Sequence, residues 1–255
     1  MNGPEIIELN PVPELTVLQA QLGEWGNLNY VLICNATKNA ILIDPFSGEF
    51  WSQHLMQRNL KTITIVLTHS HWDHTKGVNK FLKLNPKTEI LIHQLEYERG
   101  WEGLETESWT HPPNTFVNFN VGNLNFEVHC TPGHSPGHIT LIGHGIVISG
   151  DCLFLGRCGR TDLFGGNKYS MWESQMHLFL RLKKLPKEWI VFPGHQYPLN
   201  NGENPTYLPL GSVLKNNPAI QKQSFNDFAK LNFLEFDDEL SKKAKLKNMK
   251  HGEFR

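Results

Sequence analysis

The segment Ile63-Thr-Ile-Val-Leu67 runs directly into Thr68-His69-Ser70-His71-Trp72-Asp73-His74. Its first part is a short, apolar, β-branched run, which is typical of a buried strand. Its second part places four potential metal ligands at the end of that strand. Side chains two apart in an extended backbone share a face, so the His-x-His pair can bind one ion while the Asp-His pair turns toward another.

A cation is the simplest reason for this density of ligands. Packing unpaired imidazoles and a carboxylate together costs desolvation energy unless a positive charge organises them. The alternative is a polar loop of mutually hydrogen-bonded histidines. We favour the metal, because buried ionisable groups seldom cluster unpaired.

Three further segments repeat the pattern of a strand followed by a tight turn that carries one ligand. Phe126–Cys130 leads to Gly133-His134, Ile146–Ser149 leads to Gly150-Asp151, and Trp189–Phe192 leads to Gly194-His195. Glycine before each ligand permits a sharp reversal and a close backbone approach. Taken singly, each is more typical of a plain turn, and Asp151 of a helix cap. Their joint occurrence predicts that all four loops gather on one rim.

Strands and helices alternate along the chain, with more strands than helices. Further apolar, β-branched runs predict strands at Leu15–Leu18, Tyr30–Ile33, Ala40–Ile43, Glu89–Ile92 and Ile139–Ile142. Helical periodicity appears over Phe50–Leu60, from Val78, and over Met171–Leu185. This order favours an α/β (α+β) fold with mixed sheets covered by helices over a doubly wound parallel fold. We expect residues 1–197 to form this domain. Residues 198–255 are expected to be a mainly helical extension with a solvated basic tail.

Composition excludes several classes of function. The 255 residues carry 24 Lys and Arg against 25 Asp and Glu, and the net charge of -1 provides no field for nucleic acid or an anionic membrane. The first residues, MNGPEIIELNPVPEL, resemble no targeting signal, and no apolar run approaches the roughly 18 residues that span a bilayer. We therefore expect a cytoplasmic protein. Its four scattered cysteines are expected to be reduced.

The complete pattern, HxHxDH followed by a later His, Asp and His, resembles the binuclear site of the metallo-β-lactamase superfamily. The resemblance covers about residues 15–197 and implies a four-layer αββα sandwich. It implies that one metal takes His69, His71 and His134, and that a second takes Asp73, His74 and His195. It also implies that Asp151 bridges the two metals, so every expected ligand is present.

Within the superfamily, the sequence is most similar to the glyoxalase II (hydroxyacylglutathione hydrolase) group. The similarity lies in THSHWDH, with Trp72, and in Gly150-Asp-Cys-Leu-Phe154. β-Lactam hydrolases usually replace the bridging Asp by Cys, whereas Cys152 stands one position too late. RNA-processing relatives carry long inserted domains, for which 255 residues leave no room.

The resemblance implies a metal-dependent thioesterase with a metal-bridging hydroxide as nucleophile. We expect two divalent ions, zinc in preference to iron or manganese, and Asp73 and Asp151 as catalytic residues. The substrate would be a small thioester or glutathione conjugate. Relatives hold the glutathione carboxylate with a cationic residue near Cys158-Gly-Arg-Thr-Asp162, so Arg160 is the first candidate and Arg157 the second. Alternatively, Arg160 pairs with Asp162 or with a backbone carbonyl. Tyr169 is a further candidate to line the substrate groove.

Two other functions remain open. The CGRTD segment also resembles persulfide dioxygenases, which would use one iron on His69, His134 and Asp151 and act on glutathione persulfide. The chain also lacks a clear match to the basic glutathione-binding positions of the glyoxalase II helical domain. The third possibility, a non-catalytic metal-binding module, ranks lowest because no ligand has been lost.

Overall fold

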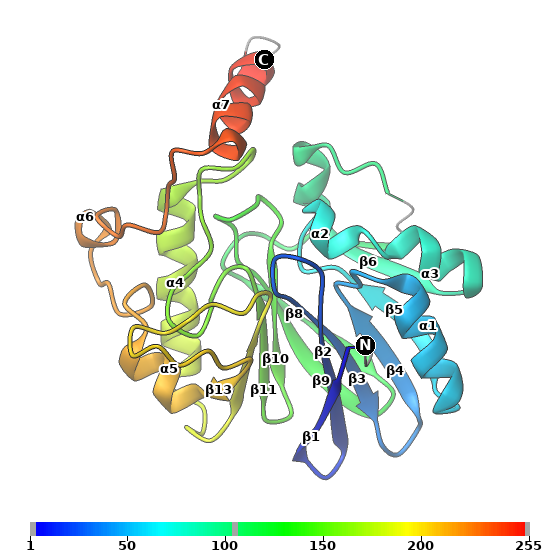
Figure 1. The fold of residues 1–255 in the computed structure, drawn as a ribbon. Helices are drawn as coiled ribbons and strands as arrows, with labels where there is room; N and C mark the ends of the chain where they lie inside the picture. Colours follow the sequence, from blue (N-terminus) through cyan, green and yellow to red (C-terminus); the bar gives the residue numbers. More distant parts are fainter. Residues whose placement is uncertain (1–3, 104–106, 253–255) are drawn as a thin grey trace.

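The computed structural model describes residues 4–103 and 107–252, and Figure 1 shows their fold. One mixed sheet of seven strands is built from the first half of the chain in the order β1 to β7. A second sheet of six strands has the order β13-β12-β11-β10-β9-β8. The first sheet contains β1 (Ile6–Val12), β2 (Leu15–Leu22), β3 (Asn27–Cys34), β4 (Asn39–Ile43), β5 (Lys61–Val66), β6 (Glu89–His93) and β7 (Glu107–Trp109). The second contains β8 (Phe116–Val121), β9 (Leu124–Cys130), β10 (Ile139–Gly143), β11 (Ile146–Gly150), β12 (Ile190–Pro193) and β13 (Leu208–Pro209).

Helices cover the outer face of each sheet. Against the first sheet lie α1 (Gly48–Gln57) and α3 (Val78–Leu84), and against the second lie α4 (Lys168–Leu182) and α5 (Leu210–Asn216). The shorter elements are α2 (Trp72–Thr75), the 3₁₀ helix η1 (Gln94–Arg99) and α6 (Phe225–Phe228). The predicted αββα sandwich is confirmed.

Three apolar clusters hold these four layers together. The central cluster lies between the sheets and includes Tyr30, Phe126 and Phe192, all fully buried. The two outer clusters lie between the helices and the sheets. One includes Trp51 of α1 and Phe81 of α3 against the first sheet, and the other includes Leu178 of α4 against the second. Residues of β2, β3 and β4 in the first sheet are buried on both faces, which explains the continuous apolar runs in the sequence.

Each predicted strand coincides with an observed one, although Leu67 lies just beyond the end of β5 and Trp189 just before the start of β12. The structure adds β1, β7, β8 and the two-residue β13. β1 and β8 are half exposed and polar on one face, and β1 contains a proline, so neither shows a continuous apolar run. The four cysteines form no disulfide, in line with the expected reduced thiols, and all four are buried.

Sheet topology brings the predicted ligand loops to one rim. β4 and β5 run parallel, as do β11 and β12. β10 lies antiparallel to both β9 and β11, so these two strands end at the same edge. Backbone hydrogen bonds join the two sheets there, from Leu28 N to Gly194 O at 2.8 Å and from Ile139 N to Thr68 O at 2.8 Å. The rim is therefore fixed by both halves of the sandwich.

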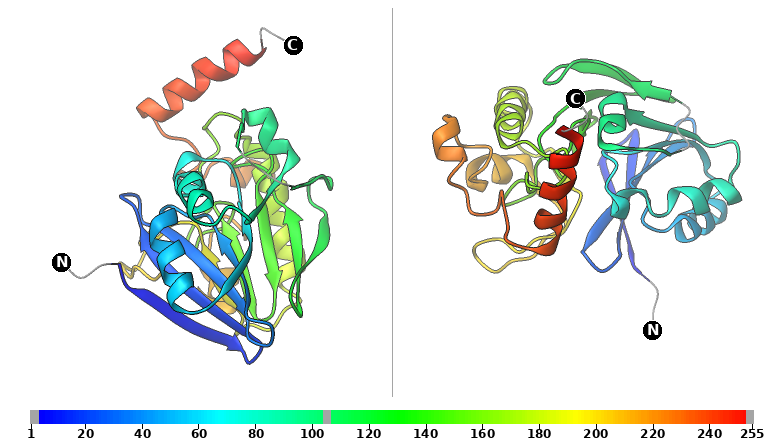
Figure 2. Two further views of the ribbon diagram at one scale, coloured as in Figure 1. Left: turned by 90° about the vertical axis from the view of Figure 1, so that its right-hand side faces the viewer. Right: turned by 90° about the horizontal axis from the view of Figure 1, so that it is seen from above.

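The C-terminal helix α7 (Glu239–Gly252) lies at this rim, beyond the ends of the strands (Figures 1 and 2). Most of its described side chains are exposed, but Ser241 and Ala244 are buried. The sequence predicted a solvated tail here. It did not predict that one face of the helix points back to the body. Residues 1–3 and 253–255, the outer ends of the two predicted domains, lie outside the described residues.

Within the described ranges, no helix combines the length and apolar character that crossing a bilayer requires.

Candidate metal centre

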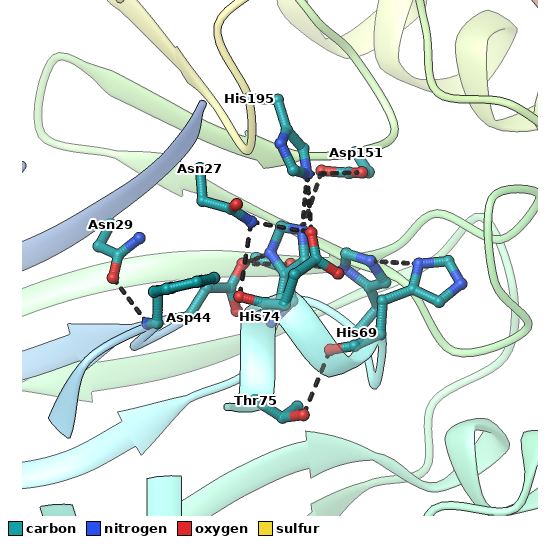
Figure 3. A network of polar contacts seen from close by, with 12 residues as sticks. Asn27, Asn29, Asp44, His69, His74, Thr75, Asp151 and His195 are labelled. Carbon is teal, nitrogen blue, oxygen red and sulfur yellow. Dashed lines mark hydrogen bonds and ion pairs between the residues drawn. The ribbon is translucent and has the colours of Figure 1, made fainter. Parts of the chain in front are cut away.

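The seven predicted ligands converge at the rim in two groups. His69, His71 and His134 form the first group, and Asp73, His74 and His195 form the second, each with ligand atoms within 4.8 Å of one another. All of these side chains are buried. Figure 3 shows Asp151 and His195 facing His74 across the centre.

Asp151 lies between the two groups. Its Oδ2 atom is 3.3 Å from His134 Nε2 of the first group and 3.4 Å from His195 Nε2 of the second. Its Oδ1 atom is 3.4 Å from His74 Nε2. One carboxylate thus faces both groups at once, in the position of a bridging ligand.

Asp44 fixes the ring orientation of two histidines. The Thr68 hydroxyl donates to Asp44 Oδ2 at 2.6 Å, which leaves its oxygen to accept from His69 Nδ1 at 3.0 Å. His74 Nδ1 donates to Asp44 Oδ2 at 2.9 Å. Both rings therefore carry the proton on Nδ1 and present the Nε2 lone pair to the centre. Asp44 also lies within ligand distance of His69 and His74. Because its oxygens already accept these hydrogen bonds, we interpret it as a support for the ligands.

Backbone carbonyls orient two more rings in the same way. His134 Nδ1 donates to the carbonyl of Arg160 at 2.7 Å, and His195 Nδ1 donates to the carbonyl of Trp25 at 3.0 Å. A carbonyl only accepts, so Nε2 of each ring has a free lone pair. Four imidazoles thus aim lone pairs at one small volume.

Several of these atoms lack a partner that fits. His74 Nε2 lies 3.1 Å from His195 Nε2, and His69 Nε2 lies 2.8 Å from His71 Nδ1. Buried His71 Nε2, His134 Nε2 and Asp151 Oδ1 have no hydrogen-bond partner among the described residues. Lone pairs facing one another at such distances repel unless a proton or a metal ion lies between them. The donor set, imidazole nitrogens and carboxylate oxygens, suits zinc, iron or manganese.

The electrostatics of the centre also favour bound positive charge. Burial holds the pKa values of His69 and His71 well below their usual range, and neighbouring imidazoles add to this effect, so both rings are neutral and able to ligate a metal ion. Burial also disfavours the charged form of His74, but the carboxylates of Asp151, Asp73 and Asp44 outweigh it and raise its pKa to about 10. Without a metal ion, the three carboxylates would therefore favour a second proton on this ring, at Nε2, where a metal ion would otherwise place its positive charge.

Asp73 is held in its ionised form. Burial alone would raise the pKa of this carboxyl group, but His74 and His195 lower it well below the ordinary value. Asn27 donates from Nδ2 to Asp73 Oδ2 at 2.8 Å and thereby orients the carboxylate. Asn27 and His195 also form an isolated β-bridge, which ties the start of β3 to the last ligand.

Glycines make room for this packing. A Cβ atom on Gly194 would lie 2.2 Å from Asp151 Oδ1, and one on Gly159 would lie 2.2 Å from the Asp151 carbonyl oxygen. Gly150 has φ +45°, and a Cβ atom there would lie 2.6 Å from His138 Nε2. His138 Nε2 accepts from Asp151 N at 3.0 Å, so His138 supports the backbone of Asp151.

Sequence reasoning missed the residues that support the ligands. Asp44 follows the apolar strand β4 and precedes Pro45, so it shows the same pattern of a strand followed by an acidic residue. That signal was available. Asn27 begins β3 beside a glycine and has no comparable signal, because its role depends on the neighbouring sheet.

A cavity of about 570 Å³ opens over the centre. It includes His71, Asp73, His134, Asp151 and His195 in its lining. The rest of its lining is mainly cationic and aromatic, together with Asp238 and a few aliphatic residues. The cations are Arg99, Arg157, Arg160, Lys243 and Lys247, and the aromatic residues are Trp25, Trp72, Phe154, Phe164, Tyr197 and Phe236.

The predicted substrate residues fall in different places. Arg160 lines the cavity, but Asp162 accepts from its Nε and Nη2 at 2.6 and 2.9 Å, and Asp238 accepts from its Nη1 and Nη2 at 2.7 and 3.0 Å. Two carboxylates thus bind this guanidinium. The ion pair with Asp162 is the alternative role that the sequence suggested for Arg160. Arg157 also lines the cavity, stacks on Tyr197 and donates to a backbone carbonyl at 2.9 Å.

Tyr169 does not line the cavity. Its half-exposed ring packs edge-on against Phe225 and lies tilted against Trp172. The glycine-rich passage that suggested a groove instead leads into α4, with Asn167 as the N-cap.

Comparison with known proteins agrees with this geometry. A family model for the metallo-β-lactamase superfamily matches residues 23–195. The chain is 34% identical over 185 residues to a hydroxyacylglutathione hydrolase of Tolumonas auensis, covering 72% of this chain and 68% of the relative. It is 32% identical over 171 residues to one of Pseudoalteromonas translucida, covering 66% of this chain and 61% of the relative.

Solved structures share the fold over most of the chain. ETHE1 from Myxococcus xanthus is 26% identical with a TM-score of 0.68, and the match covers 90% of this chain and 96% of that one. TTHA1623 in a di-iron-bound form is 27% identical with a TM-score of 0.60, and the match covers 78% of this chain and 98% of that one.

Proposed function

The chain belongs to the metallo-β-lactamase superfamily, and on this premise we propose that it is a metal-dependent thioester hydrolase of the glyoxalase II type. The observation that supports this proposal most is the position of Asp151, whose two oxygens face two separate groups of three ligands. Two divalent ions at such a centre would supply hydroxide at neutral pH and polarise a carbonyl group.

The chain's own residues would prepare the site for this reaction. We assign His69, His71 and His134 to one ion, Asp73, His74 and His195 to the other, and Asp151 to both. Asp73 would orient the nucleophile, because Asn27 holds its carboxylate and its low pKa keeps it an acceptor. No side-chain nucleophile is needed.

The cavity suits an anionic substrate such as a glutathione thioester. Arg157 and Lys243 both line it, and neither has a carboxylate partner among the described contacts. Arg160 is a weaker candidate than its position suggests, since a substrate carboxylate would compete with Asp238 for the guanidinium. We therefore propose Arg157 as the first contact for the carboxylate of the thiol carrier. The hydroxyacylglutathione hydrolases among the relatives are in line with this substrate class.

A second candidate is an iron-dependent persulfide dioxygenase. The observation in its favour is that His134 Nε2 lies 3.3 Å from Asp151 Oδ2 and that the His134 ring packs against His69, so two histidines and one carboxylate are contiguous. This set, however, leaves the second group without an ion, although His74 and His195 face each other at 3.1 Å. The second group therefore favours two ions and hydrolysis.

One experiment distinguishes the two candidates. Protein purified without added metal is analysed for its metal content and then assayed for hydrolysis of S-lactoylglutathione and for oxygen uptake with glutathione persulfide. We expect two ions per chain and hydrolysis. A single iron with oxygen consumption would reverse the assignment, and metal binding without turnover of either compound would indicate a binding module.

Replacement of the bridging residue tests the role of Asp151. We expect Asp151→Ala to abolish hydrolysis and reduce the metal content, because both groups lose a shared ligand, while the circular dichroism spectrum stays close to that of the wild type. Asp237→Ala is the control, since its carboxylate is 94% exposed and outside the cavity lining. Retained turnover in Asp151→Ala would refute the assignment.

A further inference from the structure

Two tryptophans stand half exposed beside the metal centre. Trp25 is 50% and Trp72 is 52% exposed, although tryptophan usually buries most of its surface. Their rings pack edge-on, with centroids 5.0 Å apart and an interplanar angle of 74°. Both line the cavity, and Trp72 lies in sequence between His71 and Asp73. An exposed apolar surface at a reactive centre indicates contact with a ligand.

Trp25 is held in place by the turn between β2 and β3. Gly23 and Gly26 flank it with φ of +88° and +68°, a conformation that favours glycine. A Cβ atom on Gly23 would lie 2.6 Å from the ring of Phe46, so this ring packs tightly under the turn. The carbonyl of Trp25 itself accepts from His195 Nδ1. The turn is thus tied directly to a proposed ligand.

Trp72 is supported from its other neighbours. The Phe46 ring lies 6.3 Å from it at 55°, and Lys76 Nζ lies 4.3 Å from the Phe46 centroid and 5.5 Å from the Trp72 centroid. Trp72 also begins α2 directly after His71, which fixes its backbone. Both tryptophans are therefore supported while half of each side chain stays open. An organised aromatic surface of this kind binds without a large loss of side-chain entropy.

The cationic and the aromatic residues of the cavity lining suit the two ends of a thioester substrate. The reacting carbonyl must reach the metal centre, and its acyl group and its thiol carrier lie on opposite sides of that carbon. An anionic carrier is attracted to the wall that contains Arg157, Lys243 and Lys247. The acyl group is then left to the wall formed by Trp25 and Trp72.

Resting on the thioesterase function proposed above, we propose that Trp25 and Trp72 bind the acyl group and select thioesters with an aromatic or branched apolar acyl group over small hydroxyacyl groups. A lactoyl group presents one methyl group and one hydroxyl, and covers little of this surface. A phenyl ring can pack against both indoles, with geometry preferred by aromatic pairs.

The test is a comparison of selectivity with one shared carrier. The ratio of kcat/KM for S-phenylacetylglutathione to that for S-lactoylglutathione is measured in the metal-loaded wild type and in Trp25→Ala and Trp72→Ala. We expect the wild type to prefer the phenylacetyl compound and each variant to lose about tenfold of this ratio, the effect of losing aromatic contact with the substrate. Trp25→Phe should restore part of the ratio.

Phe116→Ala is the matched control, because Phe116 is 47% exposed and is not among the residues that line the cavity. Metal content is measured in every variant. If Trp72→Ala loses metal, only Trp25→Ala is used for the comparison of selectivity. An unchanged ratio in a fully metal-loaded Trp25→Ala would overturn the acyl-site assignment while the thioesterase function stands. Failure of the metal-loaded wild type to hydrolyse either thioester would overturn the proposed function and the acyl site with it.

Discussion

Individual glycines decide whether the ligands of the metal centre can meet. Gly194 is the sharpest case, because a Cβ atom there would lie 2.2 Å from Asp151 Oδ1 and 3.1 Å from His74 Cε1. The backbone of Gly194 is also fixed, since its carbonyl accepts from Leu28 N at 2.8 Å and its N–H donates to the carbonyl of Gly150 at 2.8 Å. The carboxylate, and not the backbone, would have to move.

We therefore predict that Gly194→Ala lowers the bound metal and reduces kcat by about 100-fold, the cost of a displacement of roughly 1 Å at a reacting centre. Elemental analysis and hydrolysis assays measure both effects. Gly211→Ala is the control, because this glycine lies in α5, is not among the residues that line the cavity, and faces Lys187. Wild-type metal content and activity in Gly194→Ala would contradict the proposed position of Asp151.

At the scale of elements, α7 contributes a wall to the cavity although it lies at the end of the chain. Asp238 begins the helix by accepting from Ser241 N at 2.8 Å, and the same carboxylate pairs with Arg160. This double contact fixes the start of α7 over the rim. Lys243 and Lys247 then face the cavity, whereas Lys242 and Lys245 are exposed and do not line it.

We predict that the double variant Lys243→Ala, Lys247→Ala raises KM for S-lactoylglutathione several-fold with little change in kcat, since exposed charges of this kind contribute about 1 kcal/mol. The effect should shrink at high salt. Lys242→Ala, Lys245→Ala has the same net charge and should resemble the wild type. Equal KM values for the two double variants would show that charge on this face of α7 does not bind substrate.

At the scale of the whole molecule, the metal centre connects the two sheets. The first sheet supplies His69 and His71 from the loop after β5, and Asp73 and His74 from the short helix α2 that follows it. The second sheet supplies the other three candidate ligands from loops after β9, β11 and β12. Metal ions would therefore bind the folded sandwich and not the unfolded chain. Such binding stabilises a protein by about 2.7 kcal/mol when free metal is 100 times Kd.

We predict that removal of metal with a chelator lowers the Tm by about 5 to 10 °C, given roughly 2 to 4 °C per kcal/mol for a chain of this size. Differential scanning calorimetry measures the shift, and addition of zinc after dialysis should reverse it. In Asp151→Ala the shift should be smaller. An identical Tm with and without chelator would argue that the two sheets share no ion.

The sequence by itself determined the strands that hold the ligands and the order of the ligands along the chain. Each is a local property: a buried strand requires a run such as Ile146–Ser149, and the turn after it requires Gly150 before Asp151. The local patterns predicted mixed sheets covered by helices, and the resemblance to the metallo-β-lactamase superfamily implied the αββα sandwich, which is confirmed.

Only the tertiary structure decided which groups complete the site. Asp44 and Asn27 reach their ligands across the rim, Asp238 occupies Arg160 from 78 positions away in the chain, and Trp25 meets Trp72 between separate loops. None of these contacts leaves a periodic signal, because each side chain meets a partner that a different segment supplies. Local patterns report how a residue fits its own strand or helix, whereas such pairings exist only after both sheets have packed.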